Sequence, residues 1–243
     1  MTRLCFAILL AVAGFAIPAA AQERVLVGTQ RLSQNGALFL AAAQGYFKAE
    51  GIDVEMTAYE SGQAVAERLA AGNADLGLAG FTPTAFNLAG KGLIKAIAAQ
   101  AREKRFYEGS DIVVSNVGFA RGLQKFENLA NKSVAIDALG SAAHYQLEQI
   151  ARVKNIDIAR ISVKPMQTID AIARAVGTSQ VDAAIMPAPY ARELLASNQA
   201  KLIGWYSELD EQQLGALFVS RRMLETRRSV VEKVRARLSA RGG

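Results

Sequence analysis

Two series of short apolar runs alternate with helical segments along this chain, and this alternation most limits the folds that it can adopt. The first series has strand patterns at residues 25–27, 54–56, 75–79 and 94–99, separated by helical patterns at 37–50, at 61–71 and from Thr82-Pro83 onward. The second has strand patterns at 133–136, 161–163, 181–186 and 202–203, separated by helical patterns at 141–154, 168–176 and 189–196. This alternation is typical of βαβ units, so we expect an α/β fold with mainly parallel sheets.

The two series share a local signature. A helix ends at Gly72 and Asp75 then opens a buried strand, while a second helix ends at Gly177 before Asp182 and another buried strand. A loop containing proline follows each of these strands. The repeat predicts two Rossmann-like lobes, each with its own sheet, and structural roles for the two aspartates at the strand starts. Lone strand patterns at 111–115 and 214–220 are candidates for two crossing strands between the lobes.

The first residues have the pattern of an export signal. Arg3 precedes an uncharged run from Leu4 to Ile17, which as a helix would span about 21 Å and is too short for a hydrocarbon core of about 30 Å. The small residues Ala19-Ala20-Ala21 then fit a cleavage site. We expect a signal peptide over residues 1–21 and a mature chain that begins at Gln22; the alternative is a membrane anchor.

Composition excludes several classes of protein. Cleavage after Ala21 removes Cys5, the single cysteine, so the mature chain can form no disulfide, and one histidine cannot build a Cys/His zinc cluster. The formal charge of +6 comes from basic residues that are spread out except in the last twenty or so positions, so we expect no nucleic-acid partner. We also expect no cofactor and no metal.

The tail has a helical pattern over residues 223–238. Val230, Val231, Val234 and Leu238 share one face, with basic side chains around it. A basic amphipathic membrane helix is one interpretation. A helix docked on a lobe, with its charged face in solvent, is the favoured one.

Four segments in this order resemble one protein family. They are GALFLAAAQGYFKAEGIDVEM, ERLAAGNADLGLAG, FENLANKSVAID and SQVDAAIMPAPYARELL. They are similar to segments of ABC-transporter solute-binding proteins of the nitrate/sulfonate/taurine and thiamine-precursor type, with Asn128 and Asn131 in place of the usual Asp and Gly. The resemblance covers residues 24–240.

The resemblance implies two lobes joined by two crossing strands, with the ligand held in a cleft between them. It implies a periplasmic, monomeric protein that captures a small-molecule ligand and delivers it to the membrane permease of an ABC importer. We assign lobe I to residues 22–110, lobe II to residues 111–205, and the second crossing strand with a C-terminal helix to residues 206–243, a region that the resemblance implies is shortened.

Ligands of open α/β sheets bind beyond the carboxyl ends of the strands, where loops meet helix N-termini. Hydroxyl groups, amides and helix-start N–H groups in those loops suit a small anionic molecule. The candidate ligand-binding residues are Ser33, Asn35, Ser61, Gly62, Phe81, Thr82, Gly140, Ser141, His144, Gln167 and Pro187. For each serine and threonine, the alternative is a helix cap without ligand contact.

Other side chains leave two interpretations open. His144 either donates to an anionic ligand or is a first-turn side chain with a local hydrogen bond. Arg31 and Arg105 either pair with a ligand carboxylate or are solvated surface charges. Trp205 and Tyr206 either stack on a ring or cover the hinge.

The sequence contains no catalytic motif. It has no G-x-S-x-G, no P-loop and no H-E-x-x-H, so we expect a binding protein without enzymatic activity. Two alternatives remain at this point. One is an enzyme on the same two-lobe fold, similar to a naphthoate synthase or a desulfinase, and the other is a ligand-sensing partner of a membrane receptor.

Overall fold

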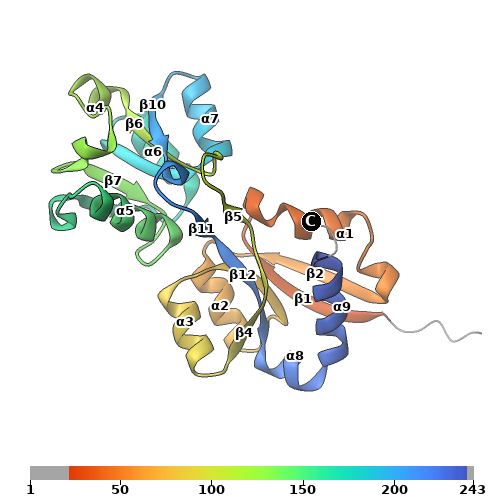
Figure 1. The fold of residues 1–243 in the computed structure, drawn as a ribbon. Coiled ribbons are helices and arrows are strands. Elements are labelled where there is room, and N and C mark those ends of the chain that lie inside the picture. The colour runs from red at the N-terminus through yellow and green to blue at the C-terminus, as the bar shows by residue number, and fades with distance from the viewer. Residues whose placement is uncertain (1–21, 240–243) are drawn as a thin grey trace, which may run out of the picture.

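The computed structural model describes residues 22–239, and within them the chain forms two lobes, each built on its own five-stranded sheet (Figure 1). The signal-peptide prediction for residues 1–21 lies outside the described residues. Helices cover the sheets of both lobes, and the only paired strands between the lobes in the described chain are two short ones (Figure 1). The α/β class and the two mainly parallel sheets are therefore confirmed.

The first sheet combines the start of the chain with one strand from near its end. Its order is β2 (Ile52–Ala58), β1 (Glu23–Thr29), β3 (Leu76–Gly80), β12 (Gly215–Ser220) and β4 (Ile94–Ala99). β1 runs parallel to β2 and β3, whereas β12 runs antiparallel to both β3 and β4. Four strands therefore share one direction, and β12 runs against them.

The second sheet repeats this plan. Its order is β8 (Ser162–Pro165), β7 (Ser133–Ile136), β9 (Ala183–Pro187), β6 (Ser110–Ser115) and β10 (Ala200–Trp205). β7 runs parallel to β8 and β9, and β6 runs antiparallel to β9 and β10. The strands β1, β2 and β3 of the first lobe thus correspond to β7, β8 and β9 of the second, and β12 corresponds to β6.

The two aspartates of the sequence signature hold equivalent places in this repeat. The backbone N–H of Leu26 in β1 donates to Oδ2 of Asp75 at 3.0 Å, and that of Ser133 in β7 donates to Oδ2 of Asp182 at 2.8 Å. Each carboxylate therefore ties the start of one central strand to its neighbour. Their structural role is confirmed.

The expected crossing strands were misplaced. Residues 111–115 and 214–220 are not crossings; they form most of β6 and β12, which lie inside the two sheets with apolar side chains buried. The crossings are β5 (Arg102–Glu103) and β11 (Gln212–Gln213), which pair antiparallel between the lobes (Figure 1). An apolar strand needs cover on both faces, so it is buried within a sheet, whereas these polar two-residue strands carry no periodic pattern to predict.

Most helices begin where the sequence predicts. They are α1 (Gly36–Ala43), α2 (Gly62–Ala70), α3 (Pro83–Gly90), α5 (Ala142–Val153), α6 (Ile169–Gly177) and α7 (Ala188–Ala196). The short helix α4 (Asn116–Ala120), directly after β6, was not predicted. The helix expected over residues 37–50 was too long, because α1 ends at Ala43. Gly45 follows with a φ of 72°, which breaks the helix, and Phe47 then turns into the core.

The tail forms two helices rather than one, α8 (Arg221–Thr226) and α9 (Arg228–Ser239), with a break at Arg227. Val230, Val231 and Val234 are buried in the core of the first lobe, so the docked-helix interpretation is confirmed. No helix among residues 22–239 is long and apolar enough to cross a membrane.

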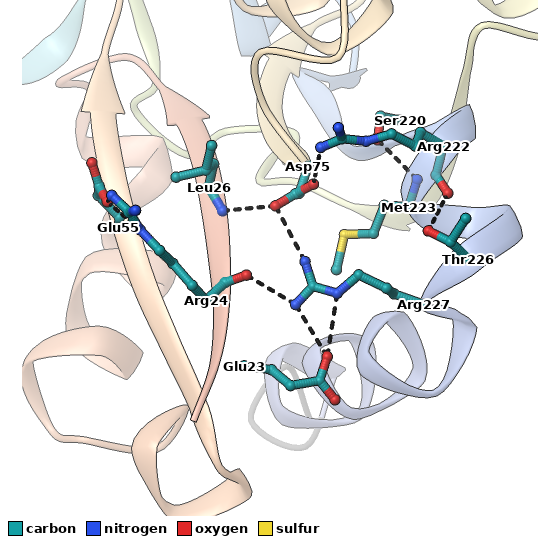
Figure 2. Close-up of polar contacts among 10 residues, drawn as sticks. All are labelled: Glu23, Arg24, Leu26, Glu55, Asp75, Ser220, Arg222, Met223, Thr226 and Arg227. Atoms are coloured by element: carbon teal, nitrogen blue, oxygen red, sulfur yellow. Dashed lines mark hydrogen bonds and ion pairs between the residues drawn. The ribbon is translucent and has the colours of Figure 1, made fainter. Parts of the chain in front are cut away.

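Ion pairs join this tail to the first sheet (Figure 2). Oδ1 of the buried Asp75 lies 3.4 Å from a guanidinium nitrogen of Arg222, and Oδ2 lies 3.5 Å from one of Arg227. Arg227 also donates to Oε2 of Glu23 and to the backbone oxygen of Arg24, at 3.1 and 2.9 Å. One carboxylate therefore holds β1, β3 and the final helices together.

Candidate functional site

A cavity of about 550 Å³ lies between the two lobes. Its walls are the loops that follow β1, β2 and β3 in the first lobe and β7, β8 and β9 in the second. Because parallel strands end at one edge of a sheet, each lobe presents three equivalent loops to the cavity.

Six of the predicted ligand-binding residues line this cavity. They are Ser61, Gly62, Thr82, Ser141, Gln167 and Pro187. They come from both lobes, and each lies at or within two residues of the start of a helix. Whether they bind a ligand stays a prediction; the structure brings them to one cavity.

Four other predicted residues are not among the lining residues. Asn35 is buried and its amide donates to Thr29 Oγ1 and to the backbone oxygen of Gln30, at 2.9 and 2.8 Å. Phe81 stacks on the ring of Phe86, with centroids 5.7 Å apart. Gly140 and His144, discussed below, are also outside the lining. Ser33 begins the short helix η1 (Ser33–Asn35), between the lining residues Leu32 and Gln34.

His144 makes a local hydrogen bond. The backbone N–H of Gly140 donates to its Nδ1 at 2.9 Å, and its Nε2 lies 3.7 Å from Oε1 of Glu148. The ring therefore supports the turn that precedes α5. This is the first-turn role that the sequence left open as the alternative to ligand contact.

Of the helices that begin at the cavity wall, α2, α5 and α6 have a hydroxyl cap and no proline in their first turn. Ser61, Ser141 and Thr168 cap α2, α5 and α6, and each hydroxyl oxygen accepts from the backbone N–H three residues later, at 3.1 to 3.2 Å. The N–H groups of the first two residues of each of these helices have no partner within the helix. Residues that carry them, such as Gly62, Ala142 and Ile169, line the cavity. Each helix end carries about half a positive charge.

The charged side chains of the cavity are mostly acidic. Arg31 is the one basic residue among the described lining residues, while Glu60, Asp137 and Asp170 are acidic. Arg105 is not in the lining, and its guanidinium lies 5.7 Å from the centroid of the Phe106 ring. Trp205 and Tyr206 are also absent from it, and Tyr206 is buried in the core of the second lobe.

Two contacts between the lobes lie beside the cavity. The hydroxyl of Tyr190 in the second lobe donates to the backbone oxygen of Arg31 in the first, at 3.2 Å. Gly140 faces Pro83 so closely that a Cβ atom at residue 140 would lie 2.8 Å from Cδ of the proline. The φ of Gly140 is 75°, a conformation that favours glycine. The two walls of the cavity are therefore in contact in this structure.

A buried polar network joins the cavity to the crossing strands. The side-chain nitrogen of Gln146 in α5, a lining residue, is 2.6 Å from Oε2 of Glu103 in β5 and 2.9 Å from Oε1 of Gln212 in β11. It is also 3.0 Å from Oγ of Ser110. Burial raises the pKa of Glu103, although hydrogen bonds from Ser110 and Gln146 oppose this rise.

Sequence reasoning missed this network. Gln146 lies one turn into a helix, beside the buried Leu147, and a polar residue on a buried helix face was the available indication. It also missed Asp111, which is fully buried with no hydrogen-bond partner for either carboxylate oxygen. Burial, with the nearby Glu108 carboxylate, raises the pKa of Asp111 to about 7.

Two lobes of matching topology, with a cavity between the carboxyl edges of their sheets, define the periplasmic binding protein fold. The chain belongs to the NMT1-like family, which matches residues 18–241. This agrees with the expected resemblance to the nitrate, sulfonate and taurine group. No match was found among curated proteins.

Solved structures share this fold. The periplasmic aliphatic sulphonate binding protein of Escherichia coli aligns with a TM-score of 0.72 and 19% identity, over 90% of this chain and 68% of that one. The alkanesulfonate-binding protein of Xanthomonas axonopodis, bound to MOPS, aligns at 0.73 and 22%, over 90% and 73%. The arginine-bound protein of T. maritima, a Gly52Ala mutant, aligns at 0.61 and 18%, over 89% and 95%.

The described residues contain no group of three or more histidine, cysteine, aspartate or glutamate side chains placed to hold a metal ion. The polar groups of the cavity are instead hydroxyls, amides, backbone N–H groups and a few charges. Such a set can hold and orient a small polar molecule through hydrogen bonds.

Proposed function

We propose that this protein is an exported solute-binding protein that captures a small anionic organic molecule and delivers it to the membrane permease of an ABC importer. The observation that carries this proposal is the inter-lobe cavity onto which α2, α5 and α6 direct their N-termini. Binding proteins with the same fold, named for sulphonates in two of the cases above, support it.

The helix ends favour an anionic group in the ligand. Free first-turn N–H groups point along each helix axis and donate hydrogen bonds, and the partial positive charge adds to them. Three such ends from two lobes surround one cavity, so an anion there can receive donors from both sides. Arg31 supplies one full positive charge at the wall.

The size of the cavity suits a small organic molecule. Ligand pockets commonly have volumes of roughly 300 to 1,000 Å³, and this one is about 550 Å³. Its lining also includes apolar side chains, among them Leu32, Ile169 and Met186, which can contact the body of an organic ligand.

Export and delivery complete the proposal. The sequence pattern of residues 1–21 supports a signal peptide and hence a periplasmic location. Two lobes joined by two-residue crossing strands can open and close by a hinge, which lets a permease distinguish the loaded from the empty protein. We infer that the protein acts as a monomer.

Calorimetric titration tests the proposal. The mature chain from Gln22 onward is titrated with a panel of small organic sulfonates, carboxylates and phosphonates, together with neutral alcohols of the same carbon skeletons. We expect at least one anion to bind with a Kd near 1 μM or below, about −8 kcal/mol, and its neutral counterpart to bind far more weakly. A folded, monodisperse chain that binds no member would contradict the proposal.

A further inference from the structure

The carboxyl group of Asp111 is isolated inside the second lobe. The residue is fully buried near the start of β6, and neither carboxylate oxygen has a hydrogen-bond partner in the described chain. Its neighbours in the register are Met186 on β9 and Trp205 on β10, and neither side chain is charged. Pairing of β6 on both sides holds the carboxyl group in this place.

Three charged side chains act on the Asp111 carboxyl group. The carboxylate of Glu108 has the strongest effect among them, from a position close enough for a hydrogen bond, and Glu103 of β5 adds a weaker repulsion. Arg192 of α7 attracts it but is already paired, because its Nε donates to Oε1 of Glu108 at 3.0 Å and its Nη2 donates to Oε2. Asp111 therefore has a like charge beside it and no cation of its own.

The other elements that pack against β6 in the described chain bring no further charge to this carboxyl group. α6 packs apolar residues against the sheet, and α4 carries no charged residue. In the short helix η5 (Tyr206–Glu208), Tyr206 interacts with Glu103 rather than with Asp111. Glu208 is exposed and accepts from the backbone N–H of Trp205 at 2.9 Å.

Two carboxylates in contact repel each other, and neither has a proton to donate, so one of them tends to stay protonated. Burial, with the nearby Glu108 carboxylate, raises the pKa of Asp111 to about 7, whereas hydrogen bonds from Arg192 lower the pKa of Glu108. The proton is therefore held at Asp111, whose O–H can donate to Glu108. Arg192, ionised Glu108 and protonated Asp111 then form a row with no net charge.

These side chains lie where the hinge meets the cavity. Glu108 belongs to the segment that leads from the crossing strand β5 to β6, whereas Asp111 lies inside the sheet, and Ser110 between them lines the cavity. The helix that carries Arg192 also carries Tyr190, whose hydroxyl contacts the first lobe. Because hinge motion changes the dihedral angles of connecting segments, it shifts Glu108 relative to Asp111.

We propose that Asp111 and Glu108 share one proton when the lobes are in contact, and that loss of this proton favours the open arrangement. Closure brings the Glu108 carboxylate against the buried Asp111, so the closed arrangement binds the proton more tightly than the open one. Since the pKa of Asp111 is about 7 with the walls in contact, the closed fraction should fall as the pH rises from about 5 to 7 and then level off. This inference goes beyond the proposed function and makes closure sensitive to the acidity around the protein.

Single-molecule fluorescence energy transfer between the lobes tests this inference without a ligand. The mature chain from Gln22 onward contains no cysteine, so a donor and an acceptor dye can be attached to Lys91→Cys and Arg174→Cys. Both positions are exposed, the first directly after α3 in the first lobe and the second in α6 of the second. On a change from about pH 8 to pH 5, the ratio of closed to open molecules should rise about tenfold, as expected when closure raises the pKa of the group by about one.

Three variants of the labelled chain locate the proton. Asp111→Asn keeps the shape of the side chain, and its amide can donate to Glu108 as the protonated carboxyl does, so it should hold the pH 5 ratio at both pH values. Glu108→Gln removes the repelling carboxylate and should abolish the pH dependence independently. Asp53→Asn makes the same change as Asp111→Asn at an exposed position of β2 and should keep the wild-type dependence. Thermal melts at both pH values check that each variant is folded.

The outcomes are distinct. An equal ratio at pH 5 and pH 8 in the wild type overturns the proposal, as does a loss of the dependence in Asp53→Asn. Histidine also changes charge in this pH range, and His144 bonds the turn at Gly140 that contacts Pro83. A dependence that survives in folded Asp111→Asn therefore assigns the titration to another group and overturns the role of Asp111. Because no ligand is present, failure of the proposed function in calorimetry leaves this result unaffected.

Discussion

Asp75 joins β1 to the final helices of the first lobe, so its loss should lower the stability of that lobe (Figure 2). Replacement by alanine leaves the N–H of Leu26 without its acceptor and removes a partner from both Arg222 and Arg227. A hydrogen bond to a charged group is worth about 1.5 to 3 kcal/mol. The two ion pairs, long and formed by partly exposed arginines, add about 0.5 kcal/mol each.

We therefore expect Asp75→Ala to lower the free energy of unfolding by about 3 kcal/mol. For a chain of this size that corresponds to a fall in Tm of roughly 6 to 12 °C. Urea denaturation followed by circular dichroism measures the free energy, and hydrogen exchange locates the loss, which should be concentrated in α8 and α9. The second lobe should keep its protection.

A double-mutant cycle with Arg227 isolates the ion pair. Arg227→Ala should cost about 0.5 kcal/mol less in the Asp75→Ala background than in the wild type, because the contact is already lost there. Arg227 retains Glu23 and the backbone oxygen of Arg24 in both backgrounds. A melting temperature for Asp75→Ala within about 2 °C of wild type would refute the reasoning.

Three further predictions concern the cavity and the hinge. Gly140→Val should weaken ligand binding by about tenfold or more in calorimetry, since its Cβ would meet Pro83, and unchanged affinity in a folded variant would contradict contact between the lobes. Asp111→Asn should be more stable than the wild type, by an amount that grows from about pH 4 to pH 7 and then levels off. The reason is that the folded-state pKa of Asp111 is raised to about 7, so the wild type loses stability as the pH rises through that window. A difference in Tm between the two proteins that does not change with pH would contradict this. Gln146→Leu should lower the free energy of unfolding by about 2 kcal/mol, because Glu103 stays buried with fewer donors, and an unchanged urea midpoint would count against this.

Local chemistry explains what the sequence predicts of the fold. The Gly–Asp–strand signature at Asp75 and Asp182 predicts two repeated lobes because each aspartate bonds a neighbouring strand within its own sheet. The crossings β5 and β11 escape prediction because two polar residues show no periodicity. The early end of α1 depends on one glycine conformation that its alanine-rich sequence does not reveal. The lobe boundaries at residues 110 and 205 stay predictions.

For the cavity, the sequence identifies loops better than side chains. The rule that ligands bind beyond the carboxyl ends of strands places Ser61, Ser141 and Gln167 correctly at the wall. Asn35 and His144 are not among the lining residues, and each bonds a backbone or side-chain partner nearby. The direction of a side chain depends on such partners, and they become visible only when the chain is folded.

The repeat of the two lobes also bears on how closure and binding are linked. The lobes are joined by β5 and β11, and Gln146 bonds both of these strands from a helix whose first turn lines the cavity. A ligand that shifts the start of α5 therefore moves the same helix that is hydrogen-bonded to the two crossing strands. Because the contacts of Tyr190 with Arg31 and of Gly140 with Pro83 lie beside the cavity, closure brings both walls to the ligand together. Ligand affinity should thus depend on Gln146 even for ligands that do not touch it.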